Sequence, residues 1–246
     1  PLKGNSPSLL TLFPKPFKLL FMRTLLRILS IVLLMIPMIA MRQDKPLKVI
    51  FFGDSITQAG VNPNGYITKM TEQFKAAGKQ NQYELIGAGI GGNKVYDLYL
   101  RLEDDVLSKK PDVVFIYVGI NDVWHKSSHG TGTDADKYVK FYNALIKKMK
   151  AQHIRVIVCT PTVIGERNDN SNSQDGDLNY YSSLIKKIAT DNQVQLCDLR
   201  KAFADHLTSN NPQNTEKGIL TTDRVHLNDE GNIFLAKLMT DALLKK

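Results

Sequence analysis

The chain alternates five short apolar segments with longer segments of helical periodicity, and this alternation limits the fold more than any other feature of the sequence. The apolar segments are rich in Val and Ile and form nearly continuous apolar runs. Such runs are typical of parallel strands that helices cover on both faces. The expected strands are 48–52, 83–87, 113–119, 155–159 and 194–199. The expected helices are 65–77, 94–109, 134–152, 178–192 and 229–245.

Repeated strand and helix units joined by right-handed crossovers build an open sheet between two layers of helices. The predicted fold class is therefore α/β, a single-domain three-layer α/β/α sandwich around a five-stranded parallel sheet. A chain of 246 residues has room for one such domain and a short additional segment. The sequence has no internal repeat and no second core, so we assign residues 45–246 to this domain.

The segment before the domain has the features of a secretory signal peptide over residues 22–40. Two arginines precede an apolar run, and polar residues follow it. The run is shorter than the roughly 20 residues of a helix that spans a bilayer. A cleavage site at Ala40 would normally have a second small residue two positions earlier, where this chain has Met38. The alternative is therefore a signal anchor that is not cleaved. Such an anchor is the one membrane contact that we expect. Residues 1–21 are upstream translated sequence or sequence added for expression.

The net charge of +8 is largely a property of this N-terminal segment. Residues 1–44 hold six basic residues and a single acid, which leaves 26 basic and 23 acidic residues in the remainder. No stripe of Lys and Arg indicates a nucleic-acid partner. The two cysteines, Cys159 and Cys197, stand inside apolar runs, where buried and unpaired thiols are expected although export would permit a disulfide. They supply no zinc motif.

The first expected strand ends in the stretch FFGDSITQAG, residues 51–60. Ser55 follows this strand at the carboxyl edge of the sheet, where open α/β folds bind ligands. The serine alone is open to three interpretations. Ser and Asp are common in turns and helix caps, and a glycine-containing loop after the first strand can hold a phosphate. The third interpretation is a nucleophile, which needs a base elsewhere in the chain.

A candidate base lies near the end of the chain in the stretch TTDRVHLNDEGN, where Asp223 precedes His226 by three residues. An imidazole can take the proton of a serine hydroxyl, and a carboxylate fixes the tautomer of the imidazole and stabilises its charged form. The alternative is a helix start with incidental polar residues, in which Asn228 or Asp229 caps the final helix. That alternative gives no reason for His226. A phosphate-binding loop after the first strand gives none either, and the stretch lacks both of its motifs, GxxxxGKS/T and GxGxxG.

Acyl transfer also needs hydrogen-bond donors aimed at the developing oxyanion. The stretch IGAGIGG, residues 86–92, places glycines after the second strand, where a backbone N–H can approach a ligand closely. The stretch VGIND, residues 118–122, places Asn121 after the third strand. Each stretch could be a simple turn. Their common location at the ends of neighbouring strands favours a shared site.

Together, GDSIT, GAGIGG, GIND and DRVH stand in the order found in SGNH (GDSL-type) hydrolases, and the sequence resembles that family from about residue 47 to 245. The resemblance implies the flavodoxin-like SGNH hydrolase fold. It implies a catalytic triad of Ser55, Asp223 and His226, and an oxyanion hole formed by Ser55, Gly89 and Asn121. The sequence departs from the family pattern at Gly87, where Asn is common, and this departure bears on how the loop around Gly89 is supported. The GxSxG elbow of the α/β-hydrolases is missing.

These motifs predict an exported serine esterase, periplasmic or secreted, with no metal or organic cofactor. The resemblance implies carboxylic esters, and the family acts on lipids, thioesters and O-acetylated sugars. The polar loops after the third and fourth strands, at 125–133 and 165–177, favour a short acyl ester of a carbohydrate. We expect substrate contacts from Asp54, Trp124 and His125, although Trp124 could equally pack beneath its loop.

Three alternative functions remain open from the sequence. The first is a lysophospholipase or thioesterase of the same fold, and the second is a catalytically idle carbohydrate-binding module. The third is a flavodoxin-like nucleotide binder.

Overall fold

The computed structural model describes residues 24–26, which are helical, and residues 45–245, which form the domain. The predicted upstream segment 1–21 lies outside the described residues, and so does the predicted signal segment 22–40 except for that short helical piece. Within the described part of the chain, no helix combines the length and the hydrophobicity needed to cross a membrane.

A five-stranded sheet forms the middle layer, and each pair of neighbouring strands is parallel. Its strands are β1 (Leu47–Gly53), β2 (Tyr83–Gly89), β3 (Val113–Tyr117), β4 (Arg155–Cys159) and β5 (Gln195–Cys197). Their order is β2-β1-β3-β4-β5, so the winding direction reverses beside β1. The predicted α/β class and parallel sheet are confirmed. The carboxyl ends of β1 and β3, on either side of the reversal, are where such folds bind ligands.

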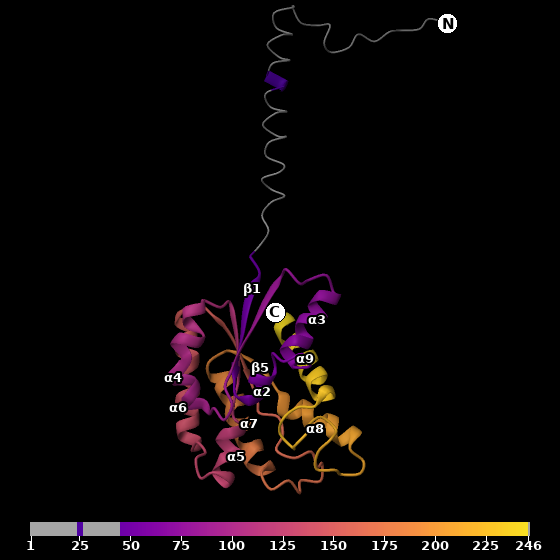
Figure 1. Ribbon diagram of the computed structural model, residues 1–246. Helices are drawn as coiled ribbons and strands as arrows, with labels where there is room; N and C mark the ends of the chain where they lie inside the picture. Colours follow the sequence, from indigo (N-terminus) through magenta and orange to yellow (C-terminus); the bar gives the residue numbers. More distant parts are fainter. Residues whose placement is uncertain (1–23, 27–44, 246) are drawn as a thin grey trace, which may run out of the picture. The chain divides into compact units, whose positions relative to one another are not determined.

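Helices cover both faces of this sheet. The helices are α2 (Ser55–Ala59), α3 (Tyr66–Ala76), α4 (Val95–Asp105), α5 (Ile120–Ser128), α6 (Ala135–Ala151), α7 (Asp175–Asp191), α8 (Leu199–Asn210) and α9 (Asp229–Leu244), with a 3-10 turn, η2 (Leu107–Lys109). Figure 1 shows α4 and α6 on one side of the sheet and α3, α8 and α9 on the other. Contacts of α3 with α9, of α4 with α6, and of α6 with α7 join the helices within the two outer layers.

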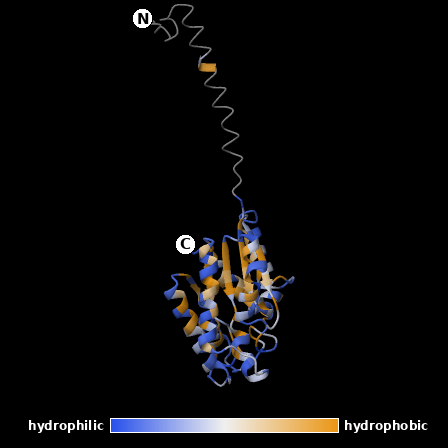
Figure 2. Cartoon of the chain, turned by 90° about the vertical axis from the view of Figure 1, so that its left-hand side faces the viewer, coloured by the Kyte–Doolittle hydropathy of each residue, from blue (hydrophilic) through white to orange (hydrophobic). Residues whose placement is uncertain are grey.

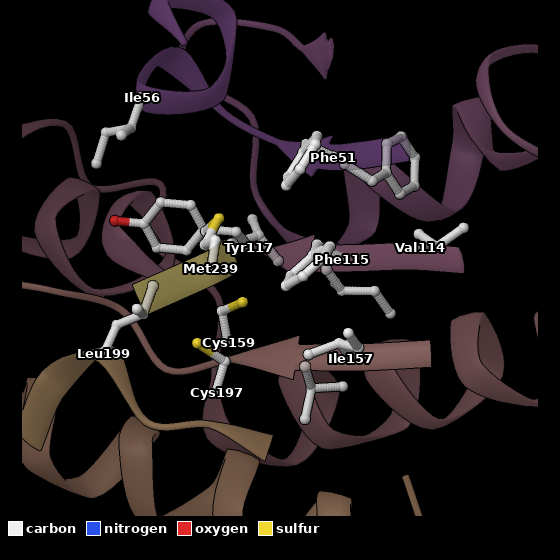
Figure 3. Close-up of a cluster of buried hydrophobic side chains, with 14 of the residues drawn as sticks. Phe51, Ile56, Val114, Phe115, Tyr117, Ile157, Cys159, Cys197, Leu199 and Met239 are labelled. Atoms are coloured by element: carbon white, nitrogen blue, oxygen red, sulfur yellow. The ribbon is translucent and has the colours of Figure 1, made fainter. Parts of the chain in front are cut away.

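The sheet carries the centre of the hydrophobic core. Figure 2 shows hydrophobic strands enclosed by helices whose outer surfaces are hydrophilic. The ring of Phe51 in β1 stacks on that of Phe115 in β3, with centroids 5.0 Å apart (Figure 3). Cys159 and Cys197 are register partners on β4 and β5, and both thiols are buried and free, as predicted. Side-chain packing therefore joins β1 to β3 and β4 to β5 across the sheet.

The structure differs from the predicted elements mainly beyond the strand ends. Ser55 and Asn121 lie in the first turns of the short helices α2 and α5, so the predicted loop 125–133 is helical as far as Ser128. β5 stops at Cys197 because the side chain of Asp198 caps α8. Helices this short contain too few apolar positions to show a period in the sequence.

Candidate active site

Ser55 is the first residue of α2 and follows β1 after a single residue, so it lies at the carboxyl edge of the sheet. Asp54 is the N-cap, and its Oδ1 accepts the backbone N–H of Ile56 at 3.0 Å. The first N–H groups of a helix have no partner within the helix. The cap therefore fixes the serine and leaves the backbone N–H of Ser55 as a donor at this edge.

Ser55 and His226 come from opposite ends of the domain sequence and meet here. The Oγ of Ser55 lies 2.9 Å from Nε2 of His226. The Nδ1 of the same imidazole lies 2.7 Å from Oδ2 of Asp223. These three side chains form a continuous hydrogen-bonded chain, a geometry in which the imidazole can take the hydroxyl proton.

A tight turn between Asp223 and His226 presents the imidazole. Oδ1 of Asp223 accepts the backbone N–H groups of Val225 at 3.0 Å and His226 at 2.7 Å. Partial burial acts to raise the pKa of Asp223, but the hydrogen bonds from His226 and from the backbone of Val225 outweigh it and lower the pKa below its ordinary value. Arg224 between them has a φ of +89°. The turn thus holds an ionised carboxylate against the ring.

A buried glutamate that the sequence did not single out supports the segment before this turn. Glu166 follows β4 and is 0% exposed. Its carboxylate accepts the N–H groups of Ile219 and Leu220, each at 2.7 Å, and both the N–H and the hydroxyl of Thr221, at 2.5 and 2.8 Å. A buried carboxylate is costly unless its oxygens are bonded in this way. Glu166 therefore fixes the chain two residues before Asp223.

Glycines allow the loop after β2 and the backbone of α2 to approach each other closely around Ser55. Gly53 and Gly89 are register partners at the ends of β1 and β2. A Cβ at position 89 would stand less than 3.0 Å from backbone atoms of Thr57 and Gln58 in α2. Further along the same loop, a Cβ at Gly91 would lie 3.9 Å from the Cβ of Ser55. The loop after β2 therefore passes directly beside the serine.

Asn121 reaches the same edge from β3. Gly119 has a φ of +142°, which side chains rarely allow, and starts α5. The amide of Asn121 is 3% exposed, and its Nδ2 donates to the carbonyl of Asn93 at 3.1 Å. A side-chain amide has two hydrogens, so one of them remains for another acceptor. Ser55 and Asn121 thus follow β1 and β3, and Gly89 ends β2, so all three stand at the carboxyl ends of adjacent strands.

Two buried carboxylates lie near the serine. Burial, the largest effect, raises the pKa of Asp54 to about 7, and the charge of Asp122 acts in the same direction. Burial likewise raises the pKa of Asp122 to about 6. Asp54 is only 2% exposed and caps α2, so its carboxylate supports the turn and does not face a ligand. This position does not support the expected substrate contact of Asp54.

Trp124 and His125 lie on α5, and both are partly buried. Trp124 packs against the core, which fits support beneath the loop. A Cβ at Gly92 would lie 4.0 Å from Cε1 of His125, so this ring borders the glycine loop beside Ser55. Partial burial, followed by the charges of Lys94 and His129, lowers the pKa of His125. Of the two residues, His125 is the one that lies at the rim of the site.

The loop after β4 adds a polar hollow on the same side of the domain as the catalytic turn. The backbone N–H of Gly165 donates to the carbonyl of Arg224 at 2.8 Å, which joins this loop to the turn. A cavity of about 150 Å³ follows, with Arg167, Asn168 and Arg200 in its lining. Among the residues that the structure describes, no three His, Cys, Asp or Glu side chains are grouped so that they could hold a metal ion.

Comparison with known sequences gives a consistent picture. The sequence model of the GDSL-like lipase/acylhydrolase family matches residues 51–232. The acetylxylan esterase of Geobacillus stearothermophilus is 30% identical over 208 residues, which make up 77% of this chain and 90% of that protein.

Solved structures extend this comparison. The acetyl xylan esterase AlAXEase superposes with a TM-score of 0.79 at 64% identity, covering 80% of this chain and 100% of that chain. A mutant of the G. stearothermophilus acetylxylan esterase Axe2 superposes with a TM-score of 0.71 at 26% identity, covering 81% of this chain and 95% of that chain. Axe2 variants described as catalytic mutants replace a histidine, an aspartate three positions before it, or a serine by alanine.

Proposed function

This chain belongs to the GDSL-like lipase/acylhydrolase family and is a carboxylic ester hydrolase, and on that premise we propose that it removes acetyl groups from carbohydrates. The observation that carries the proposal is the hydrogen-bonded chain from Ser55 through His226 to Asp223, in a domain 64% identical to an acetyl xylan esterase. We propose Ser55, His226 and Asp223 as the catalytic triad.

In the first half of the proposed reaction, Oγ of Ser55 attacks the ester carbonyl carbon while Nε2 of His226 takes the hydroxyl proton. The 2.9 Å separation of these atoms supports this role. Asp223 stabilises the imidazolium through its 2.7 Å contact with Nδ1. The imidazolium then protonates the leaving alcohol, and an acetyl-enzyme remains on Ser55.

In the second half, a water molecule attacks the acetyl-enzyme, with His226 again taking a proton, and acetate leaves. Both halves pass through a tetrahedral intermediate with a negatively charged oxygen. We propose that the backbone N–H groups of Ser55 and Gly89 and the free amide hydrogen of Asn121 bind this oxygen. Their positions at the ends of three adjacent strands support the assignment.

A carbohydrate as the alcohol part is supported by the polar surroundings of the site. The cavity after β4 contains two arginines and three asparagines in its lining, which suit the hydroxyl groups of a sugar. The loop after β2 passes beside Ser55, and the ring of His125 borders that loop; we propose that a short acyl group is the one accommodated there. We propose His125 as a substrate contact at this rim and retain Trp124 as its supporting neighbour.

The test is hydrolysis of acetylated xylo-oligosaccharides and of p-nitrophenyl acetate, butyrate and octanoate by the wild type and by Ser55→Ala. We expect rapid release of acetate, a rate that falls with acyl length, and a loss of several orders of magnitude in Ser55→Ala. A clear preference for octanoate would point to a lysophospholipase or thioesterase instead. Binding of xylo-oligosaccharides without hydrolysis of any ester would point to a binding module.

We also propose that the protein is exported, on the basis of the sequence pattern at 22–40. Cleavage after Ala40 gives Met41 as the first residue of the exported form. N-terminal sequencing of protein recovered outside the cytoplasm tests this, and an intact segment 22–40 would indicate the uncleaved anchor.

A further inference from the structure

The guanidinium of Arg101 joins the segments that carry the proposed oxyanion donors. Arg101 lies on α4, and its side chain is 14% exposed. Nη2 donates to the carbonyl of Gly53 at 2.7 Å, and both Nη1 and Nη2 donate to the carbonyl of Ala88 at 3.1 Å. Nε donates to Oδ1 of Asn93 at 2.8 Å, and Nη1 also bonds Asp105 at 2.6 Å.

Each of the first three acceptors is related to one proposed donor, either by closeness in the chain or by a hydrogen bond. Gly53 stands two residues before Ser55, and Ala88 immediately precedes Gly89. The backbone carbonyl of Asn93 accepts the amide of Asn121, so the residue whose side chain Arg101 holds also orients the third donor. One planar group therefore fixes the end of β1 against the end of β2 and the loop that follows it. The segment after β3 is held to the same loop through the Asn121–Asn93 hydrogen bond.

No other common side chain can make this set of contacts. Guanidinium has five N–H donors in a rigid fork, whereas an ammonium group presents three rotatable donors from one point. The ring of Phe52 lies against the guanidinium, with its centroid 4.5 Å from Cζ, and keeps the group in its plane.

We infer that Arg101 is the positioning residue for the oxyanion hole, acting through the carbonyls of Gly53 and Ala88 and the side chain of Asn93. This inference rests on the proposed function. We therefore expect Arg101 to affect the stabilisation of the tetrahedral intermediate. We expect no effect on ground-state binding of the ester, because the guanidinium forms hydrogen bonds only with protein groups.

The test compares Arg101→Met and Arg101→Lys with Arg155→Met. Arg155 is a matched control because it also donates to backbone carbonyls, those of Ala242, Leu243 and Lys245, but stands at the amino end of β4. For Arg101→Met we expect kcat with p-nitrophenyl acetate to fall by about 100-fold, with KM changed less than threefold. Arg101→Lys should fall by about tenfold, and Arg155→Met should retain the wild-type kcat while its Tm falls.

A second readout separates positioning from general damage. Methylboronic acid forms a tetrahedral adduct with a serine hydroxyl, and its Ki should rise in the Arg101 variants by the same factor by which kcat/KM falls. If Arg101→Met fails to fold, the same comparison applies to Arg101→Lys. An unchanged kcat, or an equal loss of kcat in Arg155→Met, would overturn the inference and leave the esterase proposal intact. A wild type inactive on every ester would overturn both.

Discussion

Nδ1 of His226 lies 2.7 Å from one carboxylate oxygen of Asp223, and the other oxygen of the same carboxylate accepts the backbone N–H of His226, also at 2.7 Å. One side chain therefore orients the imidazole and closes the turn that carries it. The separation of three residues makes both contacts possible at once. The pairing of Asp and His within a single turn is thus local, and it depends on the rest of the fold only for its placement beside Ser55.

The two functions of this carboxylate can be separated by substitution. Asp223→Asn keeps an oxygen that can accept the backbone N–H groups, but it removes the charge that stabilises the imidazolium. We expect kcat/KM to fall by about 10³–10⁴-fold with little change in Tm. Asp223→Ala should lose as much activity and also lower Tm. Steady-state kinetics and thermal unfolding measure the two effects, and an Asn variant with more than a tenth of wild-type activity would contradict the assignment.

Glu166 should be essential to the position of the catalytic turn. In the Glu166→Gln variant, an amide NH₂ group replaces a carboxylate oxygen that accepts N–H donors in the wild type. At least one buried donor therefore loses its acceptor. We expect the free energy of unfolding to fall by roughly 2–4 kcal/mol, and kcat/KM to fall with it. Denaturant unfolding and kinetics check both effects. Glu103→Gln on the exposed side of α4 is the control and should change neither.

Burial of Asp54 predicts a pH-dependent contribution to stability. The pKa of Asp54 is about 7 in the folded state, against an ordinary value of 3.8. Between pH 3.8 and 7 the folded protein therefore keeps a proton on this carboxyl group, whereas the unfolded chain releases it. The stability from this group is therefore complete below about pH 4 and is lost as the pH rises through 7. The Asn side chain of Asp54→Asn still caps α2 but does not titrate.

The measurement is the free energy of unfolding of wild type and Asp54→Asn from pH 4 to 8. The wild type should lose a few kcal/mol relative to the variant over this range, because one pKa unit corresponds to about 1.4 kcal/mol. Asp104→Asn on the exposed side of α4 provides the control. Parallel pH profiles for wild type and Asp54→Asn would contradict the raised pKa.

Position 89 should accept no side chain. A Cβ there would stand less than 3.0 Å from the backbone of Thr57 and Gln58, so Gly89→Ala must displace α2 or β2. We expect at least a 100-fold loss of kcat/KM and a lower Tm. Gly176→Ala is the matched control, since its Cβ would meet nothing within 4 Å inside α7. That variant should keep full activity and equal or higher stability.

The strands and the helices α3, α4, α6, α7 and α9 were accessible from the sequence because their apolar runs bury whole faces, whereas the 12-residue helix α8 was not predicted. The predicted strand at 155–159 matches β4, and the predicted helix at 134–152 is α6 extended by one residue at each end. The short helices α2 and α5 were missed because capping and glycine geometry start them, not an apolar period. Ser55 and Asn121 could be singled out because they stand just after strands, and His226 because it stands three residues after an aspartate.

Arg101 and Glu166 could not be found in the same way. Charged residues on a helix or in a polar loop are normally solvated, and the partners of both are mostly backbone groups, which leave no trace in the residue types around them. Only the folded arrangement shows that Glu166 is fully buried and that Arg101 bridges the end of β1 to the end of β2 and its loop. The burial and capping role of Asp54 could not be predicted either, because a capping carboxylate and a ligand-facing one look alike in sequence.

The close approach of Gly89 to the first turn of α2 has a bearing on how this enzyme can diversify. Where backbone meets backbone there is no layer of side chains to repack, so a mutation in the loop after β2 shifts the nucleophile itself. Substitutions that change ester preference without moving the nucleophile are therefore expected on α5 and in the loop after β4. A laboratory search for altered ester preference should accordingly randomise residues 124–133 and 167–174 and leave 87–93 unchanged.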